Sequence, residues 1–360
     1  MSGGFDFVPF SSIDPSDPFF DSLRLDYPEF DDWFAGKSSS GKHAFVAADD
    51  DGILAFLYLK RDQDEAVPLV GGRLPDTPRL KIGTLKISDR SRGDRLGEGA
   101  IGIALWQWRD SRLPEVYITV FEKHAQLVAL LKKFGFGLAG EKPNGESVYV
   151  KMRDGLSYET PYASFPFVDP QFPEASILVI EQDYHDQLFP YSELGRTPQE
   201  VMRVTAGNGV TKVYIGRARE MAARPGCPVL IYRKFMGEGR GFKSVVTSYG
   251  AVTAVRQFKR NGQILLPYEE YRELVKNKSV FDDAELDERW SERSVVVVEL
   301  VYLGYFGQGH NVNWAWLKNN KLWKDCYPNQ ARYTPGEFFT ILEGGGVRRE
   351  DAVIDQPGAR

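Results

Sequence analysis

Cysteine and histidine are scarce in this 360-residue chain. It contains two cysteines and four histidines: Cys227, Cys326, His43, His124, His185 and His310. Two cysteines build no disulfide framework, and neither they nor the scattered histidines have the spacing of a metal site. The sequence therefore predicts a protein without a disulfide scaffold and without a metal.

Long apolar runs are also lacking. The longest, residues 294–303, is interrupted by Glu299 and is far too short to cross a bilayer, so we interpret it as a buried strand. The N-terminus, Met1-Ser-Gly-Gly-Phe-Asp6, has neither the basic region nor the apolar core of a signal peptide. We expect a cytoplasmic protein with no membrane partner. Its 42% hydrophobic and 26% charged residues are ordinary for a globular protein with a large core.

Charge is unevenly distributed along the chain, whose net charge is −5. Carboxylates cluster in the first 35 residues, among them Asp14, Asp17, Asp21, Asp26, Glu29, Asp31 and Asp32. Residues 212–260, by contrast, contain many basic side chains and only two acidic ones, Glu220 and Glu238. A local basic stretch in an acidic chain predicts an anionic partner for that stretch.

The length predicts about two to three domains. Residues 156–175 are rich in proline and aromatic side chains without periodicity, which predicts a linker. We therefore expect a first domain over residues 1–155, a second over 176–348 and a flexible tail over 349–360.

The first domain shows helix signals from Pro18 and near residues 30–34, and an alternating pattern that predicts a β-hairpin over 43–48 and 53–59. A continuous pattern then spans residues 81–136. Its predicted parts are a strand over 81–88, a glycine loop over 92–99, a helix to Arg109, a strand over 116–121 and a helix ending in Lys132-Lys-Phe-Gly-Phe136, with a last strand over 147–151.

A glycine loop that opens a helix is suited to phosphate oxygens, because the backbone approaches closely and the first-turn amides point at the anion. Here Asp94-Arg-Leu-Gly97-Glu-Gly99 resembles the loop of the GNAT family of acetyl-CoA-dependent N-acyltransferases, usually written Gln/Arg-x-x-Gly-x-Gly/Ala. Asp94 departs from that pattern. The resemblance covers about residues 17–153 and implies acetyl-CoA or coenzyme A as cofactor. It implies these cofactor-binding residues: Ile87, Ser88, Arg92, Arg95, Leu96, Gly97, Glu98, Gly99 and Ala100.

The family commonly carries a tyrosine on the helix that ends in Gly-Phe, and this tyrosine protonates the leaving thiolate. Counting back from Gly135 places Leu131 at that position. Acyl transfer to an amine still requires proton transfer, so we take Glu122, His124 and Tyr117, on or just after the 116–121 strand, as catalytic candidates. The alternatives are a surface or capping role for His124, a helix-dipole role for Glu122 and a core position for Tyr117.

The second domain alternates strands with short helices. Strands are predicted at 177–181, 210–217, 228–234, 244–258 and 294–306, and helices after Thr197, over 268–276 and after Thr334. This pattern resembles the PUA-like superfamily of small β-barrels, which includes ASCH and EVE domains, many of which bind RNA or a modified base. The two resemblances together imply an α/β fold class, with a mixed sheet covered by helices on both faces and then a β-barrel with peripheral helices.

Aromatic residues interleave with the basic residues of 212–260, as in surfaces that hold single-stranded nucleic acid. We take as nucleic-acid-binding candidates Arg217, Arg233, Lys234, Arg240, Lys243 and Tyr249. The alternative is a solvated barrel surface whose strands carry Tyr and Phe for packing.

The sequence thus suggests an N-acetyltransferase whose second domain selects an RNA or nucleobase-bearing substrate. Two alternatives remain open: a catalytically inactive GNAT-fold regulator that binds nucleic acid, and an acetyltransferase for proteins or small amines. Some small members of the family act on aminoacyl-tRNA as toxins, so a toxin–antitoxin partner is conceivable. The oligomeric state is left open.

Overall fold

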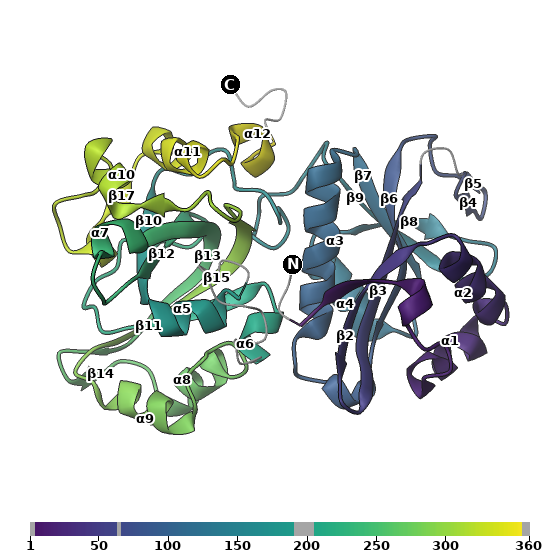
Figure 1. Cartoon of the computed structure of the whole chain (residues 1–360), viewed down its shortest axis with the longest axis horizontal. Coiled ribbons are helices and arrows are strands. Elements are labelled where there is room, and N and C mark those ends of the chain that lie inside the picture. Colours follow the sequence, from purple (N-terminus) through teal and green to yellow (C-terminus); the bar gives the residue numbers. More distant parts are fainter. Residues whose placement is uncertain (1–3, 63–65, 191–204, 355–360) are drawn as a thin grey trace. The chain divides into compact units, whose positions relative to one another are not determined.

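A computed structural model describes residues 4–62, 66–190 and 205–354 (Figure 1). The chain divides into two compact units, unit 1 over Met1–Asp154 and unit 2 over Gly155–Arg360. Each unit is a mixture of helices and strands around its own sheet, which places the chain in the α/β class.

Unit 1 is built on a seven-stranded sheet with the order β1-β2-β3-β6-β7-β9-β8. Its strands are β1 (Asp6–Pro9), β2 (His43–Asp49), β3 (Gly52–Asp62), β6 (Arg79–Ile87), β7 (Glu115–Val120), β8 (Gly137–Glu141) and β9 (Ser147–Met152), and β4 (Pro68–Leu69) pairs with β5 (Gly72–Arg73) separately. Its helices are η1 (Phe10–Ser12), η2 (Pro18–Phe20), α1 (Asp21–Asp26), α2 (Phe30–Ser39), η3 (Asp89–Ser91), α3 (Leu96–Ser111) and α4 (Ala125–Lys133).

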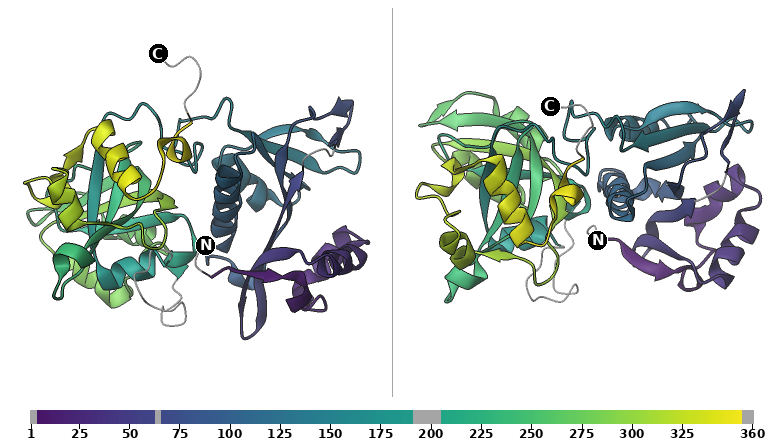
Figure 2. Two further views of the ribbon diagram at one scale, coloured as in Figure 1. Left: turned by 45° about the horizontal axis from the view of Figure 1, so that its top comes forward. Right: turned by 90° about the horizontal axis from the view of Figure 1, so that it is seen from above.

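Helices cover both faces of this sheet, with α3 on one side and α1 and α2 on the other (Figure 1). Figure 2 shows α3 against the strands from two further directions. The α2 side is packed mainly by aromatic rings, such as Phe20, Phe34 and Phe56, which are 0–3% exposed. Burial of large aromatic side chains is a strong source of stability. The predicted hairpin, the 81–136 pattern and the strand over 147–151 are confirmed as elements of this unit.

Unit 2 contains an eight-stranded sheet in which β11-β15-β13-β12-β10-β17 form one path, and β14 and β16 pair with β13. Its strands are β10 (Ala175–Glu181), β11 (Thr211–Gly216), β12 (Pro228–Lys234), β13 (Val245–Arg260), β14 (Gln263–Ile264), β15 (Val295–Tyr305), β16 (Val312–Asn313) and β17 (Arg332–Tyr333). Its helices are α5 (Gln182–Leu188), α6 (Thr205–Asn208), α7 (Arg240–Lys243), α8 (Tyr268–Val275), α9 (Asp283–Ser291), α10 (Trp314–Asn319), η5 (Pro328–Gln330), α11 (Pro335–Gly344) and α12 (Arg349–Ala352).

The five predicted strands of unit 2 and its helix near residues 268–276 are confirmed, with ends that differ by a few residues. The predicted helix start at Thr334 is confirmed in detail. The Thr334 side chain accepts from the Glu337 amide, and the Glu337 side chain accepts from the Thr334 amide. This capping box satisfies amides that the first helical turn leaves without partners. The helix predicted after Thr197 lies outside the described residues.

The segment predicted as a linker is part of unit 2. Phe165 and Phe167 are 0% exposed, and Phe172 packs on Phe338 with ring centroids 5.4 Å apart. The predicted flexible tail is also ordered over its described part, because Val168 N donates to Ala352 O at 2.8 Å. This packing was not predictable from the proline-rich composition, because the buried rings follow no regular period in the sequence.

Candidate functional site

The strands β6 and β7 run parallel and then separate. Their pairing spans Arg79–Ile82 on β6 and Glu115–Ile118 on β7. Beyond Ile82, β6 continues to Ile87 against β3, while β7 continues to Val120 against β9. Over the described residues 83–88 and 119–122, the two strands are therefore neighbours in the sheet order without being paired. This leaves an opening in the middle of the unit 1 sheet.

Helix α3 begins just after this opening. Arg95 precedes it as the N-cap residue in the left-handed conformation, with φ of 61°. A Cβ built on Gly97 would lie 3.7 Å from both Ile87 Cγ1 and Leu130 Cδ2. The first turn of α3 is therefore packed between the end of β6 and α4. The first turn of a helix presents amide groups and the positive end of the helix dipole.

The predicted cofactor residues fall into two groups. Leu96, Gly99 and Ala100 are buried, so they offer only their backbone to a ligand. The two arginines differ from each other. Arg92 is 69% exposed and pairs with the exposed Asp89, whereas Arg95 is 10% exposed and pairs with Glu98 at 2.9 Å. The remaining residues, Ile87, Ser88, Gly97 and Glu98, are half-buried. Arg92 is thus the more accessible cation of the loop, and the Arg95 charge is already matched by Glu98.

The three predicted catalytic residues do not lie together at one accessible site. Tyr117 is 1% exposed and packs with Val67, Leu74 and Val148 in an apolar cluster, which corrects the expectation that it faces an open site. Glu122 and His124 follow β7 and are exposed. The His124 imidazole is 49% exposed, and its Nε2 lies 3.6 Å from Oδ2 of Asp26.

Glu122 is held by a residue that the sequence analysis did not select. Tyr149, on β9, donates its phenol proton to Glu122 Oε1 at 2.8 Å. Hydrogen bonds from Ser147 and Tyr149 hold the pKa of Glu122 below its usual value, so the carboxylate is ionised at neutral pH. Burial and the bond to Glu122 raise the pKa of Tyr149. This pair is set by the β7–β9 register, which no local sequence pattern shows.

A second polar cluster, also missed by sequence reasoning, surrounds Glu146. Its Oε1 accepts from Tyr27 at 2.8 Å and from Thr119 at 3.1 Å, while its Oε2 accepts from Asn144 at 2.9 Å and from Lys142. Burial raises the pKa of Glu146, but these bonds outweigh burial and leave it lowered. Glu146 therefore ties the end of α1 and the β8–β9 turn to β7 beside the opening.

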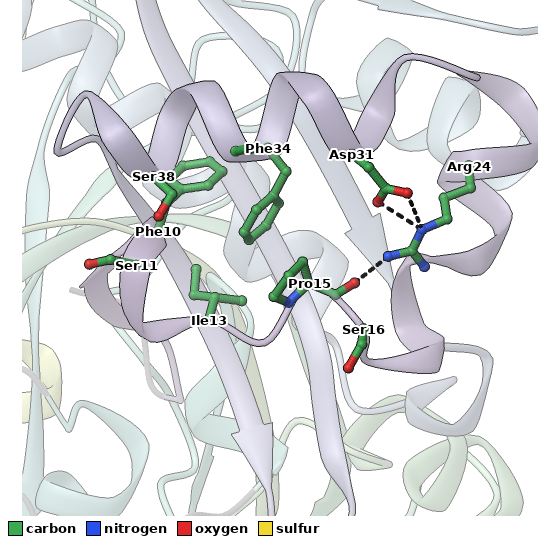
Figure 3. Close-up of a pocket in the computed structure, with 10 residues that line it drawn as sticks. Phe10, Ser11, Ile13, Pro15, Ser16, Arg24, Asp31, Phe34 and Ser38 are labelled. Atoms are coloured by element: carbon green, nitrogen blue, oxygen red, sulfur yellow. Dashed lines mark hydrogen bonds and ion pairs between the residues drawn. The ribbon is translucent and has the colours of Figure 1, made fainter.

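Figure 3 shows a pocket of unit 1. Apolar side chains such as Ile13 and Phe34 line it, and Arg24 pairs with Asp31 at one end. None of the predicted site residues lines it. Among the residues that the structure describes, no group of three or more His, Cys, Asp or Glu is placed to hold a metal ion. In the same residues no helix has the length and apolar character that crossing a membrane requires.

The predicted nucleic-acid residues of unit 2 are not one surface. Tyr249 is 1% exposed, and Arg233 is 6% exposed, with Nε and Nη2 each 2.7 Å from the Asp186 carboxylate. These two positions are corrections, because a buried ring and a buried, fully paired guanidinium are not available to a nucleic acid. Lys234 is half-buried, Arg217 pairs with Glu292 at 3.1 Å, and Arg240 and Lys243 are exposed on α7.

Comparison with known proteins gives matches among solved structures only. No protein-family model matches the chain, and no curated protein sequence matches it. An acetyltransferase of the GNAT family from Streptococcus agalactiae is 16% identical, with 42% of this chain and 97% of that chain covered and a TM-score of 0.31. Arabidopsis thaliana Naa50, in complex with a bisubstrate analogue of coenzyme A, is 18% identical, with 41% and 98% covered and a TM-score of 0.27. The ASCH protein from Zymomonas mobilis is 9% identical, with 47% and 94% covered and a TM-score of 0.31. Similarity at this level assigns neither a family nor an activity.

Proposed function

We propose that unit 1 is an N-acetyltransferase that binds acetyl-CoA at the first turn of α3 and transfers the acetyl group to an amine at the opening between β6 and β7. The observation that carries this proposal is the end of the β6–β7 pairing at Ile82 and Ile118, followed along the chain by the first turn of α3. Beyond Ile82, the described residues of β6 are no longer paired with β7, and the helix start supplies an anion site at the end of the strand.

The cofactor is assigned to these elements by its chemistry. A pyrophosphate suits the amides of residues 96–100, where Gly97 lets the backbone approach closely, and Arg92 adds an accessible cation. The amide groups of a pantetheine arm suit the unpaired edge of β6 beyond Ile82. Together these contacts direct the thioester toward the opening.

The reaction needs two proton movements. The amine nitrogen attacks the thioester carbonyl carbon and loses a proton, and the carbon–sulfur bond breaks as the departing sulfur gains a proton. The titratable groups that follow β7 are Glu122, held by Tyr149, and His124, beside Asp26. We assign the proton movements to these two pairs.

We assign selection of the acceptor to unit 2, with an RNA or nucleobase-bearing amine as substrate. The support is the concentration of basic residues in 212–260, of which Arg240 and Lys243 are exposed. A protein or small-amine acceptor is the second candidate, and a catalytically inactive nucleic-acid-binding regulator is the third. Incubation with labelled acetyl-CoA and separate pools of cellular RNA and protein distinguishes the three.

Gly97→Asp tests the cofactor site directly. A Cβ at position 97 has ordinary van der Waals distances, so the fold tolerates the substitution, while the new carboxylate repels a pyrophosphate. Calorimetry with acetyl-CoA is expected to show binding by the wild type and loss of binding by the variant, with unchanged circular dichroism.

Gly36→Asp is the matched control for this experiment. It adds the same carboxylate on α2, where nothing lies within 4 Å of a built Cβ. The control is expected to bind acetyl-CoA as the wild type does. Equal affinity of the wild type and Gly97→Asp contradicts the acetyltransferase proposal.

A further inference from the structure

Helices α7 and α10 of unit 2 pack against each other, although about 70 residues separate them in the chain. The pairing of β16 with the start of β13 brings them together, because Asn313 lies opposite Val245. Trp314 N donates to Ser244 O at 3.0 Å, and Phe235 N donates to Ser244 Oγ at 3.0 Å. The Ser244 carbonyl and hydroxyl thus hold the backbones of Trp314 and Phe235 near each other.

The surface they form exposes apolar side chains. Phe242, on α7, is 71% exposed and Met236 is 60% exposed, while Phe235 and Trp314 are half-buried. A Cβ on Gly241 would lie 3.4 Å from Trp314, so this glycine lets α7 lie close to the indole. Exposed apolar side chains beside half-buried aromatic rings on a protein surface indicate a binding site.

Cationic groups lie among these rings. Lys243 Nζ is 4.8 Å from the Phe235 ring centroid, and Lys318 Nζ is 4.6 Å from the Trp314 ring centroid. Arg240 is exposed on the same helix as Phe242. Within residues 205–354, no carboxylate forms an ion pair with Arg240, Lys243 or Lys318. No carboxylate of these described residues neutralises the three charges, whereas the chain as a whole has a net charge of −5.

We infer that this α7–α10 surface, formed by Phe235, Arg240, Phe242, Lys243, Trp314 and Lys318, binds single-stranded nucleic acid. The inference rests on the part of the proposed function that assigns substrate selection to unit 2. The three cations bind phosphates, and the Phe242 ring provides a platform for an unpaired base.

The exposed Phe242 ring distinguishes between the polyanions that could bind the three cations. A duplex keeps its bases stacked in the helix interior, so it gains little from Phe242. An acidic peptide has carboxylates for the cations but no planar group that requires a ring face. A single strand uses both kinds of side chain. The α7–α10 surface also differs from the nucleic-acid surface predicted from the sequence, because the buried Arg233 and Tyr249 are not part of it.

Fluorescence anisotropy with a labelled single-stranded oligonucleotide tests this inference on the full-length protein. The wild type is expected to bind at ~0.1 M salt, and the triple reversal Arg240→Glu, Lys243→Glu and Lys318→Glu is expected to weaken binding by about tenfold or more. Loss of three phosphate contacts lowers the slope of log affinity against log salt by about 2, at ~0.7 per contact. Phe242→Ala, at an exposed position, is expected to weaken binding roughly 5- to 150-fold, which corresponds to one stacked base.

The matched control reverses three exposed cations of unit 2 outside residues 212–260, Lys276, Arg293 and Arg348. It makes the same change in net charge and is expected to leave affinity within about threefold of the wild type. Absence of binding by the wild type, or equal weakening by the control, overturns the inference. So does tighter binding of a duplex or of a poly-glutamate peptide, or full affinity of Phe242→Ala.

Calorimetry with acetyl-CoA separates this inference from the proposed function. The α7–α10 variants lie in unit 2 and are expected to keep the wild-type affinity for acetyl-CoA. If Gly97→Asp has no effect while the α7–α10 variants lose the oligonucleotide, the acetyltransferase proposal fails and the nucleic-acid surface stands. If Gly97→Asp loses acetyl-CoA while the α7–α10 variants bind the oligonucleotide as the wild type does, the nucleic-acid inference fails and the acetyltransferase proposal stands.

Discussion

The phenol oxygen of Tyr149 lies 2.8 Å from Oε1 of Glu122, so the last strand of unit 1 orients a carboxylate that follows β7. Ile118 and Tyr149 are opposite each other in the β7–β9 register, and the Tyr149 ring lies near α4, with Lys132 Nζ 5.9 Å from its centroid. Leu131, on the same helix, is 0% exposed and packs in the core. The phenol that contacts Glu122 thus comes from β9, whereas Leu131 of α4 provides only an apolar side chain.

Tyr149→Phe is expected to move the pH dependence of acetyl transfer. The hydrogen bond from Tyr149 favours the ionised form of Glu122 and lowers its pKa, so removing the bond raises that pKa. The acidic limb of the kcat/KM profile is therefore expected to shift to higher pH, while Glu122→Gln removes this limb and lowers turnover by about tenfold or more. A profile of Tyr149→Phe that matches the wild type excludes Glu122 as the titrating group.

His124 and Lys123 provide a second comparison, because both contact Asp26. Only the histidine is assigned a part in the proposed proton movements. His124→Ala is expected to lower turnover by about tenfold or more. Lys123→Ala removes an ion pair with Asp26 and a contact with the Phe121 ring, and is expected to lower turnover by less than about threefold. Turnover is measured with the acceptor that the labelling experiment identifies. If both variants keep full turnover, the proton transfer lies elsewhere.

The strands of both units were predictable because their apolar and β-branched residues form clear runs bounded by turn residues. The β10, β12 and β15 strands agree with the predicted ranges to within two residues. The glycine loop before α3 was also predictable, because a strand, a loop and a helix follow in order. Edge strand β8 (Gly137–Glu141) was missed, since two glycines interrupt its pattern and most of it is exposed.

The direction of individual side chains was not predictable. Along β12 the residues from Pro228 to Arg233 are all buried, so no alternation distinguishes the two faces. A β-bulge between Ile231 and Tyr232 also shifts the register with β13. Arg233 pairs with Asp186, which lies on helix α5. The role of Arg233 therefore depends on tertiary contacts that the basic stretch does not show.

Lys151 makes the stability of unit 1 depend on pH. It is 1% exposed, its Nζ donates to Phe134 O at 2.6 Å, and burial lowers its pKa to about 7. Above pH 7 the folded protein holds this amine neutral, whereas the unfolded chain keeps it protonated up to its usual pKa near 10.5. The unfolded state therefore binds more protons between these values, and the free energy of unfolding rises by up to about 1.4 kcal/mol per pH unit.

Urea unfolding from pH 7 to pH 10 measures this dependence. The wild-type midpoint is expected to rise with pH more steeply than that of Lys151→Met, which has no titrating group at this position. Parallel dependence of the two midpoints contradicts a neutral buried amine.

The buried pair Asp186–Arg233 is expected to stabilise unit 2 only when both partners are present. Their side chains are 4% and 7% exposed, and Asp186 Oδ1 also lies 2.9 Å from His185 Nδ1. Burial raises the pKa of Asp186, but bonds from Arg233 and His185 outweigh it and lower the pKa to about 2, so the carboxylate stays ionised near neutral pH. Asp186→Asn leaves the Arg233 charge buried without a counter-ion, which is expected to cost about 3–5 kcal/mol of unfolding free energy.

The double variant Asp186→Leu, Arg233→Met removes both charges and is expected to cost less than Asp186→Asn. The exposed pair Arg217–Glu292, whose side chains are 55% and 33% exposed, is the control, and Arg217→Met is expected to cost at most about 1 kcal/mol. Chemical denaturation of all variants at neutral pH makes the comparison. If the double variant is as unstable as Asp186→Asn, the cost arises from lost packing and hydrogen bonds at His185, and not from an unpaired buried charge.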